Sequence, residues 1–496
     1  MVQTSKRITS LRPAQKETLT KLSSFIHEPT TPRVAMLEAP TGVGKSLIAM
    51  SISEQMKSPF TLINTATISL QEQYAGDFPT LAVLKGKSNF RCSFAEHLTP
   101  SEAPCTVETG LQCESEYYQQ EREVAEARDV VTNYSLFFAE LLHGRRWYER
   151  RPHLLVCDEG HRLLDFMTEA EAVSIDTRLA FELGFKTRPL FKLADARVWA
   201  KANLKAVEKE AIAHIMARSP RAGRFASLLR QTERLNAASG TLIPTMTGDV
   251  FKAVPLWPTT AAQGLLATPN KLLIMSATLW GGTFFAKLMG MGSYEFLGLG
   301  AQFPTERWPV YYRPVAKMNK GSEAKDWTAM SNACHDLMHS VAEKGVIHVA
   351  SYKQVDQVGR EIQRCNSCRG RLILSRLGES RAETIGRYRE GTGSWIIHPS
   401  IGEGESFDDD QCRYQIIAKL RYPDLGDPVV KLRAADSGLG SSYYFASTAA
   451  YTAQTVGRGM RHADDYCENF IFDGSFGSLY DRNKAAFPEW FRKQIR

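Results

Sequence analysis

The chain has 496 residues, of which 43% are hydrophobic and 23% are charged, and it carries a net charge of +7. Its length exceeds what one hydrophobic core supports and predicts two or three domains. It contains no run of 18 apolar residues, and the N-terminus "MVQTSKRITS" lacks the apolar centre of a secretory signal, so we expect a cytoplasmic protein without membrane spans. The positive charge is only weak evidence for a polyanionic partner. Nine cysteines without a signal peptide indicate reduced thiols rather than a disulfide framework.

The first motif is "EAPTGVGKS", residues 38–46, between the apolar run "VAML" and the helical segment "LIAMSISEQM". A glycine-containing loop between a strand and a helix can direct backbone N–H groups at a polyphosphate, which predicts an ATP site. The residues expected to bind it are Thr41, Gly42, Val43, Gly44, Lys45 and Ser46. Lys45 would reach the β- and γ-phosphates and Ser46 would bind Mg²⁺. Ala39 stands where the strict pattern has glycine, and an ordinary glycine-rich turn is the alternative.

The second motif is "LLVCDEGHRL", residues 154–163, in which an apolar strand ends at two acidic residues. Asp158 would hold Mg²⁺, and Glu159 would orient or deprotonate the attacking water. An exposed acidic pair at a strand end is common on its own. Together with the phosphate loop upstream, however, the pair forms the minimal site for hydrolysis of a nucleoside triphosphate.

The apolar pattern predicts α/β architecture on both sides of a helical segment. "VAMLEA", "FTLINTA", "DVVTNYSLFF" and "HLLVCDEG" are strand-like runs that alternate with amphipathic helices, as in a mostly parallel sheet. Residues from about 164 to 258 contain long helical segments and hardly a strand, which predicts a helical insertion. Strands return at "NKLLIMSATLW", and a second alternating series follows the proline-punctuated "GAQFPTERWPVYYRPV".

The acidic box belongs to an ordered set of blocks that spans nearly the whole chain. "DEGH" resembles the D-E-A-H box of superfamily 2 helicases, and the surrounding blocks resemble those of the XPD/DinG-like branch. In order, the blocks are "LRPAQ", "NTATISLQEQ", "LKGKSNFRC", "VVTNYSLF", "IMSATLW", "VASYKQ", "GEGESFDDDQCRYQIIAKLRYPDLGDP" and "QTVGRGMRHADDY". Single blocks occur by chance, but their joint order is specific.

The resemblance implies an α/β fold with two RecA-like parallel-sheet motor domains. It also implies a small cysteine-bearing module and a helical, arch-like insertion in the first domain. The expected boundaries are 1–85, 125–163 and 259–302 for the first, ATP-binding domain, 86–124 for the module, 164–258 for the insertion, and 303–496 for the second domain.

Two of the blocks carry further expected nucleotide contacts. Relatives read adenine at the position of "LRPAQ", which implies that Arg12 and Gln15 hydrogen-bond the base edge; a simple helix start is the alternative. In "QTVGRGMR", Gln454, Arg458 and Arg461 recur at helical spacing, so the second domain can direct guanidinium groups at the developing charge on the γ-phosphate. A solvated basic helix face would leave the glutamine and the two glycines unexplained.

Two blocks depart from the family pattern. Gly160 replaces the usual alanine after the acidic pair, a small change that we expect to leave the strand end intact. In "GEGESFDDD", residues 402–410, Ser406 stands where the family usually has aspartate. This departure puts the coupling of hydrolysis to movement in doubt, although Asp409 or Asp410 can substitute.

The cysteines leave the question of a second cofactor open. Relatives bind a 4Fe-4S cluster with four cysteines between the phosphate loop and the acidic box. This chain offers three there: Cys92, Cys105 and Cys113. His97 can complete a set, but a metal-free, vestigial module is the favoured expectation. Cys365 and Cys368 have the spacing of a zinc knuckle, but no second pair lies nearby in sequence, so zinc is not expected there.

We therefore expect a monomeric ATP-dependent DNA helicase or translocase that uses ATP and Mg²⁺ on single-stranded and duplex DNA. The resemblance implies 5′ to 3′ movement. The compact form also resembles CRISPR-associated DinG-like helicases and phage-borne relatives, which implies an R-loop and a CRISPR ribonucleoprotein as partners, or a role in DNA repair. A DNA-stimulated ATPase that remodels nucleic acid without separating strands is the alternative. A small-molecule P-loop kinase is disfavoured by "QTVGRGMR".

Overall fold

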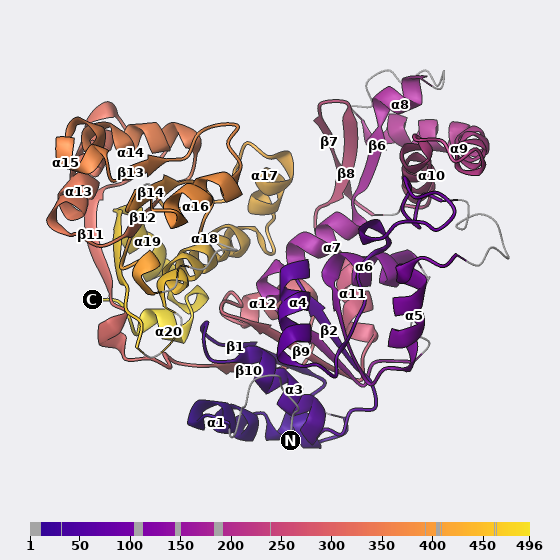
Figure 1. The fold of residues 1–496 in the computed structure, drawn as a ribbon, viewed down its shortest axis with the longest axis horizontal. Coiled ribbons are helices and arrows are strands. Elements are labelled where there is room, and N and C mark those ends of the chain that lie inside the picture. The colour runs from indigo at the N-terminus through magenta and orange to yellow at the C-terminus, as the bar shows by residue number, and fades with distance from the viewer. Residues whose placement is uncertain are drawn as a thin grey trace.

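The computed structural model describes most of the chain and contains two parallel sheets and one smaller antiparallel sheet. Figure 1 shows the two parallel sheets with the antiparallel sheet and its helices above the first of them. The described residues are 11–30, 32–103, 113–143, 150–182, 192–238, 240–391, 393–402, 407, 409–460, 462 and 464–496. The expected α/β fold is confirmed. The predictions for Cys105, Ser406 and Arg461 lie outside the described residues.

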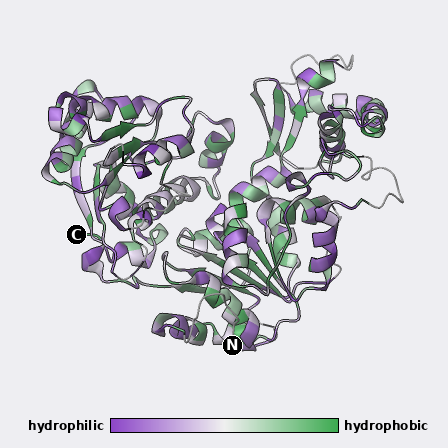
Figure 2. Cartoon of the chain, viewed as in Figure 1, coloured by the Kyte–Doolittle hydropathy of each residue, from purple (hydrophilic) through white to green (hydrophobic). Residues whose placement is uncertain are grey.

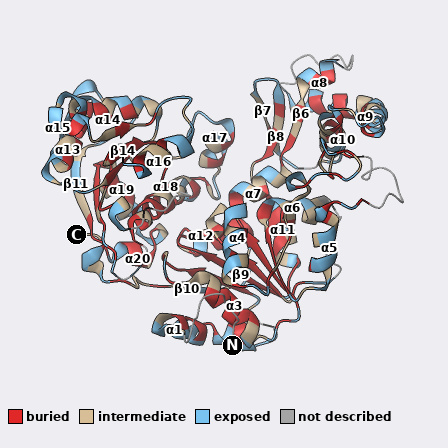
Figure 3. Cartoon of the chain, in the orientation of Figure 1, coloured by how far each residue is buried: buried red, intermediate tan, exposed pale blue. Residues whose placement is uncertain are grey.

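The first parallel sheet has seven strands in the order β10-β1-β9-β5-β2-β4-β3. These strands are β1 (Val34–Glu38), β2 (Thr61–Thr65), β3 (Ala82–Val83), β4 (Asp129–Asn133), β5 (Leu154–Cys157), β9 (Lys271–Ser276) and β10 (Glu295–Gly298). The central strands are buried along their whole length because helices cover both faces, which explains their continuous apolar runs (Figure 3).

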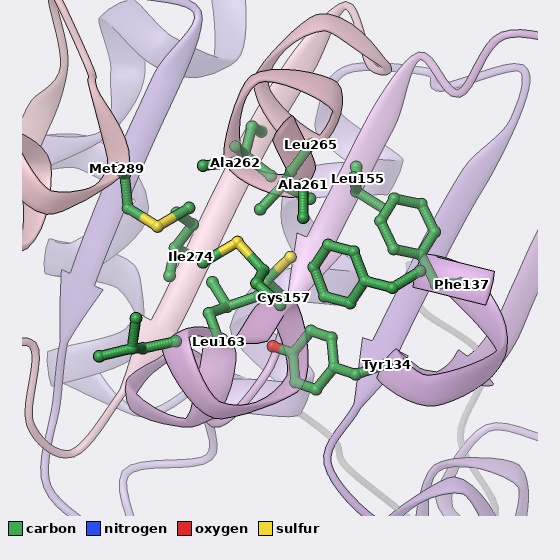
Figure 4. Close-up of a cluster of buried hydrophobic side chains, with 14 of the residues drawn as sticks. Tyr134, Phe137, Leu155, Cys157, Leu163, Ala261, Ala262, Leu265, Ile274 and Met289 are labelled. Atoms are coloured by element: carbon green, nitrogen blue, oxygen red, sulfur yellow. The ribbon is translucent and has the colours of Figure 1, made fainter. Parts of the chain in front are cut away.

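Alternate residues of each strand face two separate hydrophobic cores. Val34 and Met36 of β1 lie in one core, whereas Ala35 and Leu37 lie in the other. Figure 4 shows part of the first core, in which side chains of the sheet meet those of neighbouring helices. The helices of this part are α1 (Pro13–Lys21), α2 (Ser23–His27), α3 (Lys45–Gln55), α4 (Ile68–Asp77), α5 (Glu116–Glu126), α6 (Tyr134–His143), α7 (Leu163–Glu171), α11 (Thr259–Ala267) and α12 (Thr283–Met289), with the 3-10 turns η1 (Lys87–Asn89) and η3 (Gly160–Arg162).

The segment 164–258 is not purely helical, so that expectation was wrong. It contains α8 (Thr177–Glu182), α9 (Leu193–Met216) and α10 (Ala222–Ala237), but also β6 (Val173–Asp176), β7 (Leu242–Thr247) and β8 (Val250–Pro255). These strands form an antiparallel sheet in the order β6-β8-β7. Its apolar residues join a core with α9 and α10, while intervening residues of β6 are only half-buried. Such alternation gives a weaker signal than a strand buried on both faces.

The second parallel sheet has six strands in the order β11-β16-β15-β12-β14-β13. They are β11 (Val310–Ala316), β12 (Gly345–His348), β13 (Leu372–Leu374), β14 (Trp395–His398), β15 (Tyr414–Ile417) and β16 (Glu468–Asp473). The sequence pattern located five of them but not β11, which contains Pro314. Proline cannot donate to a strand ladder, and β11 accommodates it at the sheet edge with a register shift after Tyr312.

Helices again cover the second sheet. They are α13 (Ala324–Ser340), α14 (Tyr352–Arg364), α15 (Asn366–Arg369), α16 (Arg381–Arg389), α17 (Pro428–Ala435), α18 (Gly440–Val456), α19 (Ser475–Arg482) and α20 (Glu489–Arg492), with the 3-10 turns η4 (Thr305–Arg307), η5 (Asp409–Gln411), η6 (Gly457–Gly459) and η7 (Lys484–Ala486). Figure 2 shows hydrophobic residues concentrated in the strands and polar residues on the outer helical surfaces. Among the described helices, none has the length and apolar character needed to cross a membrane.

Two helices of the second part pack against the first part and its insertion. Tyr443 of α18 lies in the core of the first sheet, with its ring edge-on to Trp257 and Trp280. Arg433 of α17 is 5% exposed and donates to the carbonyl of Leu256, 2.7 Å away, and to Thr168 Oγ1, 2.8 Å away. The position of the second sheet is therefore fixed by apolar packing on one helix and by a buried guanidinium on the next.

Candidate nucleotide site between two parallel sheets

Three motifs meet at one edge of the first sheet. Strand β9 pairs with β1 on one side and with β5 on the other, and all three run parallel. Their carboxyl ends therefore lie side by side and lead into the loop 39–44, the acidic pair 158–159 and the "SAT" segment 276–278. Ligands of open α/β sheets bind at such edges, outside the carboxyl ends of the strands.

The loop 39–44 has the backbone expected of a phosphate-binding loop. Gly42 and Gly44 adopt φ values of +79° and +83°, which favour glycine, and helix α3 begins directly after them at Lys45. Lys45 Nζ lies 3.2 Å from the carbonyl oxygen of Ala39. Ser46 is the second residue of α3, so both predicted ligands stand at the N-terminus of a helix, where the backbone favours anions.

Arg12 and Gln15 lie directly against this loop. The guanidinium of Arg12 donates to the carbonyl oxygens of Gly42 and Val43, over 2.9 and 2.7 Å, and Gln15 Nε2 donates to Val43 over 2.9 Å. A Cβ at Gly44 would lie 2.6 Å from Gln15 Nε2. The two side chains thus hold the loop in place, a role the sequence did not suggest, and their contact with adenine stays a prediction.

Asp158 is held rigidly at the end of β5. Tyr74 donates to its Oδ2 over 3.0 Å, the backbone N–H of Glu159 donates to Oδ1 over 2.9 Å, and Tyr134 donates to its carbonyl oxygen over 2.7 Å. Burial raises the pKa of Asp158 to about 6, with the charge of Glu159 adding to the rise. A nearby cation opposes such a rise, as Lys45 already does, so the carboxylate suits a metal ligand.

Glu159 differs from its neighbour in both backbone and charge. It adopts φ +54°, a left-handed conformation that is rare for a residue with a side chain and that clusters at functional sites. Burial alone would raise its pKa, but the contact with His161 and the charges of Lys45 and Arg458 outweigh burial and hold the pKa well below the usual range. Glu159 is therefore anionic at neutral pH, as a water-orienting group must be.

A continuous polar chain leads from Glu159 to the second sheet. His161 Nδ1 lies 3.3 Å from Glu159 Oε2 and 2.9 Å from Ser276 Oγ. Ser276 Oγ accepts from the backbone N–H of Thr278 over 3.2 Å, and Thr278 Oγ1 accepts from Gln454 Nε2 over 2.8 Å. The two hydroxyls of the "SAT" segment thus join the acidic box to α18.

The end of α18 and the turn η6 stand beside the phosphate-binding loop. Thr41 Oγ1 donates to the carbonyl oxygen of Gly457 over 3.2 Å, and Arg458 is close enough to Glu159 to lower its pKa. Arg458 Nε donates to the carbonyl oxygen of Gly402 over 3.3 Å. The structure therefore brings Arg458 and Gln454 to the same edge as Lys45.

Gly160 is required by packing, which the sequence did not reveal. A Cβ at this position would lie 2.3 Å from Ile274 Cγ2 and 3.3 Å from the carbonyl oxygen of Met275. Real Cβ contacts are not that short, so alanine at 160 would force Ile274 on β9 to shift. The strand end is intact, as we expected, because glycine is there.

Glu38 is a buried carboxyl group at the end of β1 that sequence reasoning missed. It is 3% exposed, and its Oε1 accepts from the backbone N–H of Leu279 over 2.6 Å. Burial raises its pKa to about 7, against the opposing effects of that hydrogen bond and of Arg492. Glu38 therefore ties the phosphate-binding loop to the segment after "SAT". An acidic residue at the end of an apolar run was the one available signal.

The cysteine-bearing module brings two of its three cysteines together. Cys92 Sγ and Cys113 Sγ are 3.9 Å apart and buried against helices α9 and α10. His97 instead lies 3.0 Å from the carbonyl oxygen of Arg218. In the part of the chain that the structure describes, no third metal-ligating atom joins these two thiols. Because Cys105 lies outside that part, the iron-sulfur cluster stays a prediction.

Individual proteins resemble this chain in sequence or in fold. ATP-dependent DNA helicase CHL1 of Yarrowia lipolytica is 25% identical over 194 residues, which cover 32% of this chain and 24% of that helicase, so the match spans about a quarter of its length. An XPD helicase structure superposes with a TM-score of 0.67 at 16% identity, covering 97% of this chain and 98% of that one. For S. tokodaii Xpd4 the TM-score is 0.59 at 16% identity, with coverages of 98% and 99%. These structural likenesses show the fold alone.

Two family models match regions that contain most strands of the two parallel sheets, without β9, β10 and β11. The type III restriction enzyme res subunit model matches residues 8–185, and the helicase C-terminal domain model matches residues 334–494. Each model covers about a third of the chain, and both matched regions border the candidate nucleotide site between the sheets. The chain is thus similar to helicases in sequence over parts of its length, and to XPD helicase structures in fold.

The packing at position 160 predicts a specific coupling. Gly160→Ala should lower the free energy of unfolding by about 1–3 kcal/mol through overpacking against Ile274. Ile274→Ala alone should cost about 2–4 kcal/mol through the cavity it leaves. In the double variant the new methyl group occupies that cavity. The free energy of unfolding that the double variant loses should therefore be smaller than the sum of the two single losses, by about 1 kcal/mol or more. Denaturant unfolding of wild type, the two single variants and the double variant measures this coupling. Losses of free energy that simply add would contradict a steric contact between positions 160 and 274.

The raised pKa of Glu38 predicts a pH effect on stability. The folded protein holds this proton up to about pH 7, whereas the unfolded chain releases it near pH 4.5, so wild-type stability should fall as the pH rises across that window. The loss attributable to Glu38 is on the order of 3 kcal/mol. Glu38→Gln cannot ionise and should flatten the fall between pH 5 and about 8 in thermal unfolding. The exposed Glu17→Gln serves as the control, and parallel pH profiles for wild type and Glu38→Gln would refute the assignment.

Proposed function

We propose that this protein is an ATP-dependent DNA helicase or translocase that moves 5′ to 3′ along a single strand. The observation that carries the proposal is the polar chain from Glu159 through His161, Ser276 and Thr278 to Gln454. A motor of this kind must convert events at the γ-phosphate into movement of one sheet relative to the other. These polar contacts directly connect the acidic residue at the nucleotide site with helix α18, which covers the second sheet.

The residues at the carboxyl edge of the first sheet fit ATP and Mg²⁺. The backbone of 41–46 and Lys45 would hold the phosphates, while Ser46 and Asp158 would bind the metal. When bound, Mg²⁺ neutralises charge on the phosphate oxygens. Glu159, kept anionic by its surroundings, would orient the attacking water.

Arg458 would act on the charge that develops during phosphoryl transfer. It stands at the C-terminal end of α18, across from Lys45 and within electrostatic range of Glu159. A guanidinium delivered from the second sheet is effective only when the sheets are closed, which makes hydrolysis depend on their relative position. We assign the same role to Arg461 from the family resemblance.

A hollow beside the nucleotide edge supports a nucleic-acid track. It has a volume of about 480 Å³, and its polar lining includes Thr67, Ser88, Asn89, Asn133 and Ser135. These residues come from the blocks "NTATISLQEQ", "LKGKSNFRC" and "VVTNYSLF", which are distant in sequence. Neutral hydroxyl and amide groups bind a sugar–phosphate backbone without reading sequence, as a translocating protein requires.

The biological setting and domain division follow from the family resemblance. We propose 1–85, 125–163 and 259–302 as the first motor domain, 303–496 as the second, and 86–124 and 164–258 as its accessory parts. We also propose a monomer in the cytoplasm that acts on single-stranded and duplex DNA, including R-loops. A CRISPR ribonucleoprotein is the proposed partner, with DNA repair as the other setting.

The role of Glu159 is tested by Glu159→Gln. The variant should retain ATP and DNA binding because Asp158 and Lys45 remain, but its turnover should fall by about 100-fold or more once the water-orienting carboxylate is gone. Steady-state phosphate release with single-stranded DNA measures turnover, and fluorescence anisotropy measures DNA binding. Glu169→Gln, an exposed residue on α7, is the matched control. Wild-type turnover in Glu159→Gln would remove this residue from the mechanism.

The motor activity is tested with three duplexes, carrying a 5′ single-stranded tail, a 3′ tail or blunt ends, each with ATP and Mg²⁺. Release of the shorter strand should occur on the 5′-tailed duplex, because the proposed nucleic-acid track at the polar hollow holds one backbone with fixed polarity. The other two duplexes should stay largely paired. Lys45→Ala should abolish release on every substrate, which excludes a contaminating helicase.

Two other results of that experiment are decisive. Release on the 3′-tailed duplex alone would reverse the proposed polarity. DNA-stimulated hydrolysis without release on any duplex would refute the motor. The protein would then be a nucleic-acid remodelling ATPase, with Ser406 as the leading explanation.

A further inference from the structure

A second group of metal-binding side chains lies away from the nucleotide site. His335 and His339 stand one turn apart on α13, and Cys365 and Cys368 flank the start of α15. One ligand atom from each lies within 4.8 Å of the other three. None of the four residues contributes to the polar chain or to the phosphate-binding loop.

The distances within this group match those around a tetrahedral zinc ion. His339 Nδ1 lies 3.7 Å from Cys365 Sγ and 3.5 Å from Cys368 Sγ. Zinc bonds of about 2.3 Å to sulfur and about 2.0 Å to nitrogen, at tetrahedral angles, separate the two ligand atoms by about 3.5 Å. The imidazole of His339 therefore already stands at the spacing from both thiols that the ion requires.

The fourth side chain is oriented in the same way. His335 Nδ1 lies 3.0 Å from Asp336 Oδ1, whereas its Nε2 is buried, and the imidazole interacts with the Cys365 thiol. A carboxylate on one imidazole nitrogen is the usual support for a histidine whose other nitrogen binds metal. A metal ion would satisfy the buried nitrogen and the thiol together.

We propose that His335, His339, Cys365 and Cys368 form a structural zinc site. Two thiolates and two imidazoles in a closed tetrahedron favour zinc over harder cations. The sequence argued against zinc because no second pair lies near the cysteines. The structure supplies that pair from another helix, in the pattern H-x₃-H followed by C-x₂-C.

The site would fasten two segments that the chain connects only through β12 and α14. His339 is near the end of α13, just before β12, while Cys368 lies just before β13. Arg371 already joins the same segments, since its guanidinium donates to the carbonyl oxygens of Met338 and Val341. Zinc would add a second, stronger connection at this edge of the second sheet.

The test measures metal in the purified full-length protein by mass spectrometry. Wild type should hold about one zinc per chain, whereas Cys365→Ser/Cys368→Ser and His335→Asn/His339→Asn should each hold little. Cys334→Ala changes a buried cysteine beside His335 on the same helix and should retain the metal. Cys92→Ser/Cys113→Ser should also retain zinc, which separates this site from the cysteine-bearing module.

Cobalt gives a second readout that does not depend on the folding of the ligand variants. Co²⁺ added to metal-stripped Cys92→Ser/Cys113→Ser should produce, at one equivalent, the visible absorption of tetrahedral cobalt with thiolate ligands. Zinc below about a tenth of an equivalent in folded wild type, without this spectrum, would overturn the proposal. Full zinc retention in soluble Cys365→Ser/Cys368→Ser would overturn it as well.

Discussion

The hydrogen bond from Gln454 Nε2 to Thr278 Oγ1 is the constraint on which the site depends. Both side chains are almost completely buried, so neither can exchange the partner for water without a cost of about 1–3 kcal/mol. Thr278 is bonded to Ser276 and, through it, to His161. A displacement of the second sheet would therefore move the hydrogen-bonded residues that lead to the carboxylate of Glu159, which lies beside His161. Tyr443 packs in the hydrophobic core of the first sheet, and the buried Arg433 hydrogen-bonds to Leu256. These two contacts keep the sheets close enough for the hydrogen bond between Gln454 and Thr278 to form.

Features of the fold and of the candidate site that depend on a single strand or loop could be predicted from the sequence. Parallel strands are buried on both faces, so they appear as apolar runs, and glycines with left-handed backbone appear as fixed motif positions. The carboxyl ends of parallel strands lie at one edge of a sheet. This rule alone predicts from the sequence that Lys45 and Asp158 lie close together. Strand β11 was missed because Pro314 is tolerated only at an edge, and an edge is a property of the assembled sheet.

Other features depend on neighbours from distant segments. Burial raises the pKa of Glu38 against the hydrogen bond from Leu279, and Ile274 makes glycine the best-fitting residue at 160. Likewise, the two histidines of α13 become partners of Cys365 and Cys368 only because α13 and α15 pack against each other in the fold. Sequence spacing reports contacts along one element, and these three contacts run between elements.

The contact between Gly160 and Ile274 also constrains which residues the two positions can carry together. A methyl group at 160 overpacks against the branched side chain at 274, so the effects of substitutions at the two positions are coupled. A change from glycine to alanine in the acidic box costs least stability where residue 274 is small, which favours one order of substitutions. We expect homologues to show correlated residues at these positions. A sequence search that requires alanine at this position would discard chains such as this one, in which β9 carries the branched Ile274.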